Sequence, residues 1–141
     1  MANRMFNRVQ ALDKELKIIQ GQFTHNSTVA VLIENKSPGV KSVTQGATGN
    51  IAIVLGTPSG DTDIYPHFYN GMFTYQNASA HGGTVGFHFQ IKSSTINSDG
   101  TLNIFTLDKN GAATNLPTNT TVHFTLILKN SNVAGVGAGS V

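Results

Sequence analysis

The chain has 141 residues, a formal net charge of +2 at pH 7 and no cysteine, and only 11% of its residues are charged. This length suits one domain with its own hydrophobic core. The absence of cysteine excludes disulfide bonds and thiolate chemistry, and no apolar run approaches the roughly 20 residues of a membrane-spanning helix. The low charge, against about 25% in an average domain, favours a surface that packs against neighbours.

The distribution of charge argues against a nucleic-acid partner. Residues 1–20 hold four basic and two acidic side chains, whereas residues 21–141 hold five of each. Binding to phosphates requires a patch of several basic residues that releases counterions. The chain beyond residue 20 has no such excess of positive charge, so we expect neither nucleic acid nor membrane as a partner.

Residues 4–20 carry the one clear helical period of the chain. Their apolar residues recur at spacings of 4, 3, 4 and 3, which is the heptad pattern of Met5, Val9, Leu12, Leu16 and Ile19. Gly21 follows, as is typical where a helix ends. We therefore predict an N-terminal amphipathic association helix over residues 1–21. Two heptads are too short to be stable alone, so the helix packs on the sheet of its own domain or against a second copy of the chain.

From Phe23 onward the apolar residues alternate instead, which is typical of strands with one buried face. In residues 122–129, four alternate positions form one apolar face, namely Val122, Phe124, Leu126 and Leu128. Residues 84–93 alternate in the same way. Further strands are expected at residues 28–35, 40–45, 50–56 and 101–107. Residues 50–56 are apolar on both faces, which predicts a central strand.

Turn signals rich in Gly, Pro, Asn and Asp separate these strands, at residues 37–39, 46–49, 97–100 and 108–111. Asn70-Gly71 lies within the aromatic-rich residues 65–75 and predicts a tight turn between two short strands. The whole pattern predicts a mainly β fold, an antiparallel β-sandwich or jelly roll over residues 22–132. Residues 133–141 contain only Gly, Ala, Ser and Val, which predicts a flexible Gly-rich tail.

The five histidines show no spacing typical of a metal site. His88 and His123 each precede a phenylalanine in the two best-patterned strands, and they would face each other if those strands paired. We interpret them as partly solvated residues of strand faces. The sequence therefore predicts no metal and no cofactor.

The acidic residues also lack a catalytic pattern. Asp61 and Asp63 share a Gly-rich loop, but without a third acid they fall short of the about 6–8 oxygens that Ca²⁺ takes. Asp99 and Asp108 lie in turn sequences, where aspartate side chains bind the main chain. A glycosidase needs a pair of carboxylates across a cleft, so we predict that the chain is not an enzyme.

The tyrosines are the best candidates for a ligand face. Tyr65, Tyr69 and Tyr75 fall in one short stretch, and aromatic rings with a polar tip are suited to binding sugars. The same residues are equally compatible with an interface or with the core. A carbohydrate-binding or adhesion module of a virion or cell surface is therefore an alternative function.

The two ends of the chain resemble a known group of proteins. The chain opens with Met1-Ala2-Asn3-Arg4-Met5-Phe6-Asn7-Arg8-Val9-Gln10, followed by Leu12 and Lys14-Glu15. This opening resembles the start of small virion structural proteins of tailed bacteriophages. Residues 123–131, which read His123-Phe124-Thr125-Leu126-Ile127-Leu128-Lys129-Asn130-Ser131, are similar to the last strand of the same proteins. Residues 37–83 carry no such match.

The resemblance implies a non-enzymatic structural protein of the virion. Members of this group are regarded as head decoration (cement) proteins or other virion structural proteins. The resemblance therefore implies a location on the capsid surface, the major capsid protein as partner, and a homo-oligomer that is a trimer or a dimer. The residues expected to contact another copy or the capsid are those of the heptad pattern, namely Met5, Val9, Leu12, Leu16 and Ile19.

Overall fold

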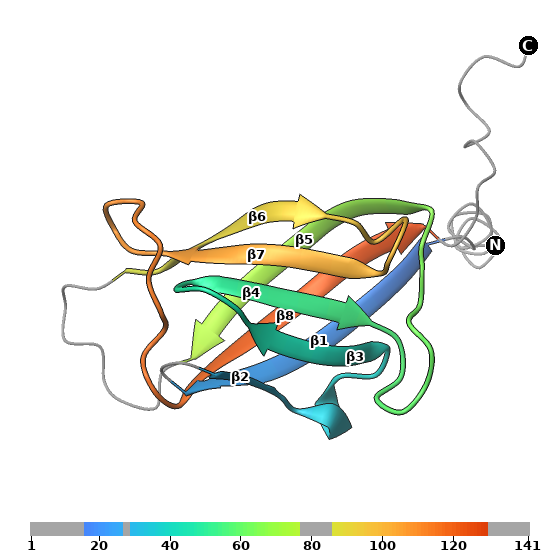
Figure 1. Ribbon diagram of the computed structural model, residues 1–141, viewed down its shortest axis with the longest axis horizontal. Coiled ribbons are helices and arrows are strands. Elements are labelled where there is room, and N and C mark those ends of the chain that lie inside the picture. The colour runs from blue at the N-terminus through green and yellow to red at the C-terminus, as the bar shows by residue number, and fades with distance from the viewer. Residues whose placement is uncertain (1–15, 27–28, 77–85, 130–141) are drawn as a thin grey trace, which may run out of the picture.

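The computed structural model describes residues 16–26, 29–76 and 86–129. They form eight β-strands and one short 3-10 helix, η1 (Figure 1). In chain order these elements are β1 (Leu16–Asn26), β2 (Val29–Leu32), η1 (Glu34–Lys36), β3 (Val40–Gln45), β4 (Asn50–Leu55), β5 (His67–Gln76), β6 (His88–Ser94), β7 (Thr101–Leu107) and β8 (Thr120–Lys129). The prediction of a mainly β fold is confirmed.

The strands form two antiparallel sheets that lie face to face. Sheet A has the strand order β2-β1-β8-β5, and sheet B has the order β3-β4-β7-β6. Figure 1 shows the strands of sheet B crossing diagonally over those of sheet A. The first and last strands of the described chain, β1 and β8, are neighbours in the middle of sheet A. The arrangement is a sandwich of two antiparallel sheets, as predicted.

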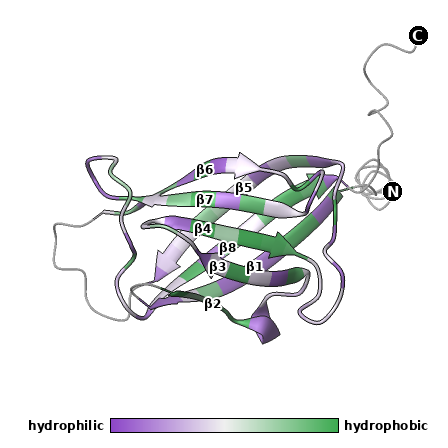
Figure 2. Ribbon diagram, viewed as in Figure 1, coloured by the Kyte–Doolittle hydropathy of each residue, from purple (hydrophilic) through white to green (hydrophobic). Residues whose placement is uncertain are grey.

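The core lies between the sheets and follows the alternation of the sequence. On β8, Val122, Phe124, Leu126 and Leu128 are all buried, because side chains two apart on a strand share a face. On β4 the buried positions also alternate, and Figure 2 colours most of this strand as hydrophobic. Full burial of one such side chain stabilises the fold by about 1.5–3 kcal/mol.

The predicted helix is wrong at its C-terminal end. Residues 16–20 belong to β1, and they pair with residues 125–129 of β8. The side chains of residues 18 and 19 show a period of two, because Ile18 is 60% exposed whereas Ile19 is 1% exposed. The expected stop, Gly21, lies inside the same strand. Pairing with β8 supplies main-chain hydrogen bonds along one side of β1, and Ile19 is buried in the core between the sheets.

This correction moves one boundary of the predicted domains. The sandwich includes residues from Leu16 onward, not only from residue 22. The remainder of the predicted helix, with Met5, Val9 and Leu12, lies outside the described residues. So does the tail predicted at residues 133–141.

The tight turn predicted at Asn70-Gly71 is also wrong. Both residues lie within β5, which pairs with β8 from His67 to Gln76. The pairing register shifts between Phe68 and Asn70, which marks a bulge and not a reversal of the chain. The ten-residue strand β8 offers β5 a continuous partner, so the local turn preference yields to long-range pairing.

Other predicted turns are present. Each of the four predicted turns contains a glycine with a positive φ, of which Gly100 has φ 71° and Gly111 has φ 80°. Glycine adopts this left-handed conformation without the steric cost of a Cβ atom. The turns therefore fix where the strands of the sandwich end.

Candidate functional site

The structure does not bring the three tyrosines onto one face. Tyr65 is buried, and burial together with the charge of Asp63 raises the pKa of its hydroxyl. Tyr75 points towards the core, where its ring lies edge-on to Phe87 with the centroids 5.7 Å apart. Only Tyr69 is exposed, at 56%. The ligand face predicted from these tyrosines is therefore not formed.

The predicted interface residues also separate. Leu16 is exposed at the first position of β1, whereas Ile19 lies in the core and is not accessible to a partner. Ile18, which the heptad pattern passes over, is the most exposed large hydrophobic residue of the described chain. Ile127 is directly opposite Ile18 on the outer face of sheet A. Leu16 and Ile18 are exposed and Ile127 is half-buried. Together they form an apolar patch at one end of sheet A, which we call the apolar edge.

The two strand histidines lie in different sheets. His88 is on β6 and pairs with Leu107 in sheet B, whereas His123 is on β8 in sheet A. The strands β6 and β8 are not neighbours, so the histidines do not face each other across a pair of strands. Within the described residues, no three His, Cys, Asp or Glu side chains gather as a metal site would require.

Asp99 and Asp108 both stabilise turns, as predicted. The Asp99 carboxylate accepts hydrogen bonds from the hydroxyl of Thr95 at 2.5 Å and from the main-chain N–H of Thr101 at 3.0 Å. The Asp108 carboxylate accepts main-chain hydrogen bonds from Asn110 at 2.8 Å and Ala112 at 2.9 Å. These bonds favour the charged form and lower the pKa of both carboxyl groups.

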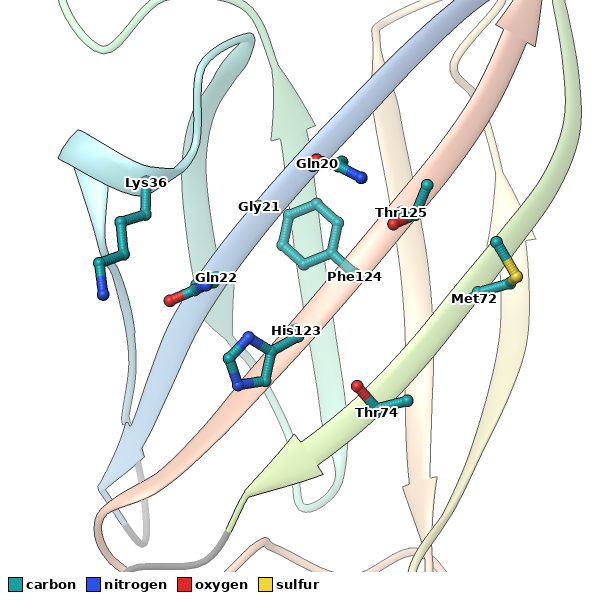
Figure 3. Close-up of a pocket in the computed structure, with 9 residues that line it drawn as sticks. All are labelled: Gln20, Gly21, Gln22, Lys36, Met72, Thr74, His123, Phe124 and Thr125. Atoms are coloured by element: carbon teal, nitrogen blue, oxygen red, sulfur yellow. The ribbon is translucent and has the colours of Figure 1, made fainter.

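A hollow on the outer face of sheet A gathers polar side chains from three strands (Figure 3). We call it the sheet A hollow, and its cavity volume is about 310 Å³. It spans β1, β8 and β5, with a contribution from η1. Its lining consists of Gln20, Gly21, Gln22, Lys36, Met72, Thr74, His123, Phe124 and Thr125.

Cross-strand pairing builds the hollow from two rows of side chains. In one row, Thr125 of β8 lies between Gln20 of β1 and Met72 of β5. In the next row, His123 lies between Gln22 and Thr74. Alternation places these side chains outside, since their neighbours on β8 point into the core. Thr125 of β8 has a shorter side chain than Gln20 and Met72 on either side of it, which leaves space between them.

Lys36 reaches the hollow because η1 is fixed against β1. The buried hydroxyl of Ser37 accepts a hydrogen bond from the N–H of Gln22 at 2.9 Å and donates one to the carbonyl of Ile33 at 2.8 Å. The N–H of Ile33 bonds to the carbonyl of Gln22 at 3.0 Å. The single charged residue of the lining therefore has a defined position at the rim.

The chemistry of the lining is polar and almost uncharged. Within the described part of the chain, the side chains of Gln20, Gln22, Thr74, His123 and Thr125 have no hydrogen-bond partner and no acidic residue lines the hollow. Amide, hydroxyl and imidazole groups each donate and accept hydrogen bonds. This set is suited to binding a polar ligand. It lacks the paired acid and base of a hydrolytic site.

The hollow is not apparent from the sequence for a specific reason. Residues 16–20 appeared helical, so Gln20 and Gln22 were not placed on one face of a strand. The alternation of residues 122–129 did put His123 and Thr125 on the less apolar face of their strand. The sequence does not tell which residues of β1 and β5 lie beside these two residues, because that depends on the strand order of the sheet.

No protein family, no curated protein and no solved structure matches the chain. Residues 16–26, 29–76 and 86–129 contain no helix with the length and apolar character needed to cross a membrane.

Proposed function

We propose that the chain is a non-enzymatic structural protein of a tailed-bacteriophage virion, which decorates the capsid surface and stabilises the head shell. The observation that carries this proposal is the pairing of Leu16 with Lys129 in sheet A. These are the first and last described residues. Residues 1–15 and 130–141 therefore join the sandwich at the same end.

A sandwich whose first and last described residues lie at one end is suited to attachment through that end. In this proposal the end with Leu16 and Lys129 faces the support, and the opposite end points away from it. Figure 1 shows the start of β1 and the end of β8 side by side. The major capsid protein is the proposed support, and a homo-oligomer, trimer or dimer, is the proposed state on the shell.

The apolar edge lies at this same end. Leu16 and Ile18 are 40% and 60% exposed, and Ile127 lies beside Ile18. Exposed apolar side chains that adjoin one another are typical of interaction surfaces. The low charge of the chain, 11%, also suits a surface that mates closely with neighbouring proteins.

The test uses capsid shells assembled from the major capsid protein of the same phage, without this chain. We expect the full chain to sediment with the shells and to raise their melting temperature. Ile18→Asp places a charge on the apolar edge and is expected to weaken binding by about tenfold or more. Val31→Asp is the matched control, because Val31 is 54% exposed on the same face of sheet A, but on the edge strand β2.

Binding by the control and the full chain, with loss in Ile18→Asp, supports the proposal. Circular dichroism verifies that both variants are folded. If the full chain neither sediments with the shells nor changes their melting temperature, the proposed function is wrong. If Ile18→Asp binds the shells as well as Val31→Asp does, the apolar edge is not the surface that attaches to the capsid.

A further inference from the structure

We propose that the sheet A hollow binds a neutral saccharide. The ligand site is a second function beside attachment to a capsid, and it uses residues other than the apolar edge. Gln20, Gln22, Thr74, His123 and Thr125 supply the hydrogen bonds, and Met72 supplies an apolar contact.

The hollow offers several polar side chains that make no hydrogen bond with other described residues. Figure 3 shows these side chains arranged around one hollow, coming from β1, β8 and β5. None of the five polar side chains has a hydrogen-bond partner among the described residues. A ligand that both donates and accepts at closely spaced positions would satisfy them together. Hydroxyl groups on a sugar ring have this property.

The lining of the hollow carries little charge. Lys36 is the one charged residue among the described residues that line the hollow, and it lies at the rim. A divalent cation such as Ca²⁺ takes about 6–8 oxygen ligands, usually with carboxylates among them. The lining has no carboxylate, and the amide oxygens of Gln20 and Gln22 fall short of such a set. A phosphate or sulfate is usually held by several cationic or main-chain N–H donors. The lining therefore favours an uncharged ligand.

The size and shape of the hollow suit a small sugar. A cavity of about 310 Å³ is at the lower end of small-molecule sites, which fits one or two sugar units. Met72 is exposed beside Thr125 and offers a polarizable surface to the C–H face of a sugar ring. The lining comes mainly from paired strands, so binding requires little ordering of the main chain.

The test is an NMR titration of the ¹⁵N-labelled full chain with free sugars. The probes are glucose, galactose, mannose, N-acetylglucosamine, maltose and lactose. We expect at least one of them to shift the amide signals of residues 20–22, 72–74 and 123–125 selectively, with a dissociation constant on the order of millimolar. Gln22→Ala and His123→Ala are each expected to weaken binding by about tenfold.

Thr24→Ala is the matched control, because Thr24 lies on the outer face of β1 but outside the hollow. It is expected to bind as the unchanged chain does, and the spectra verify that each variant is folded. Maltose oligomers of increasing length distinguish a free sugar from a unit of a polysaccharide, since only the latter binds more tightly with length.

Three results would overturn the proposal. One is the absence of selective shifts with every sugar at concentrations well above the millimolar range. Another is equal weakening in Thr24→Ala and Gln22→Ala. The third is that inorganic phosphate produces the same shifts and displaces the sugar, which would make the hollow an anion site. Capsid binding is measured separately, so failure here leaves the proposed function standing.

Discussion

Gly21 and Phe124 lie directly opposite each other in sheet A, and the ring of Phe124 occupies the space that a side chain at residue 21 would need. A Cβ atom at Gly21 would collide with this ring. The same ring packs against Phe23 and Phe73 in the core, with centroids 6.2 Å and 6.1 Å away. The missing side chain of Gly21 thus allows the middle of the core to close.

Gly21→Ala is expected to destabilise the fold by about 1–3 kcal/mol, because overpacking forces side chains and strands apart. Urea unfolding measures the loss. Gly46→Ala is the control, since only the far end of Asn50 lies within 4 Å of its added Cβ atom. Adding Phe124→Leu to Gly21→Ala should restore part of the stability lost. Equal stability of the two alanine variants would contradict this explanation.

Acidification is expected to destabilise the protein through His25, which is fully buried at the end of β1. Burial lowers the pKa of its ring, and the nearby Gln45 side chain and Leu116 main chain oppose the shift only partly. Neither ring nitrogen has a hydrogen-bond partner of normal geometry. The unfolded chain therefore takes up a proton at about pH 6.5, whereas the folded chain does so only at lower pH.

The free energy of unfolding should thus be constant above about pH 6.5 and should fall as the pH drops below it. Urea unfolding at about pH 7.5 and about pH 5.5 measures this difference. His25→Leu is expected to reduce the difference, whereas His67→Gln, at an exposed position, should retain it. The explanation fails if His25→Leu leaves the pH dependence unchanged.

Asp99 and Asp108 should affect the free energy of unfolding at a lower pH than His25 does. Their pKa values lie below the usual 3.8, so the stability that they contribute is present above that pH and is lost as the pH falls through their folded values. The Thr95 hydroxyl is the largest cause for Asp99. Thr95→Val should therefore raise the pKa of Asp99 towards its usual value and leave Asp108 unchanged, as followed by NMR titration of the carboxyl carbons.

Ser37→Ala is expected to destabilise the fold by about 1–3 kcal/mol, because it leaves buried main-chain groups without their hydroxyl partner. The N–H of Gln22 loses its acceptor, and only the main-chain bond between Ile33 and Gln22 still joins this segment to β1. Thermal unfolding measures the loss. Ser42→Ala, at a half-buried position of β3, is the control and should change stability little. A similar loss in both variants would argue against the role of Ser37.

The strands of the core were predictable because their apolar residues alternate without ambiguity. Val122, Phe124, Leu126 and Leu128 fit a period of two only, whereas Leu16 and Ile19 are three residues apart and fit a heptad instead. The strand interpretation of β1 requires Gly21 and His25 at inward positions, which the sequence does not suggest. The Asn70-Gly71 signal was local, and pairing with β8 overrode it.

The sheet A hollow was not predictable for a different reason. Gln22 and His123 are neighbours through strand pairing between residues that lie far apart in the chain. Alternation tells which face a residue takes, but not which strand lies beside it. The aromatic stretch was the stronger local signal, yet its tyrosines separate into the core and the surface.

The position of β8 between β1 and β5 determines when the fold can be completed during synthesis. Sheet A lacks one of its two central strands until the last described residues have left the ribosome. Until then Ile19 and Phe23 have no partner strand on the β8 side. We expect a chain that ends at residue 119 to show no cooperative unfolding transition, and a cooperative one would refute this. The nascent chain therefore needs protection from aggregation until its final strand arrives.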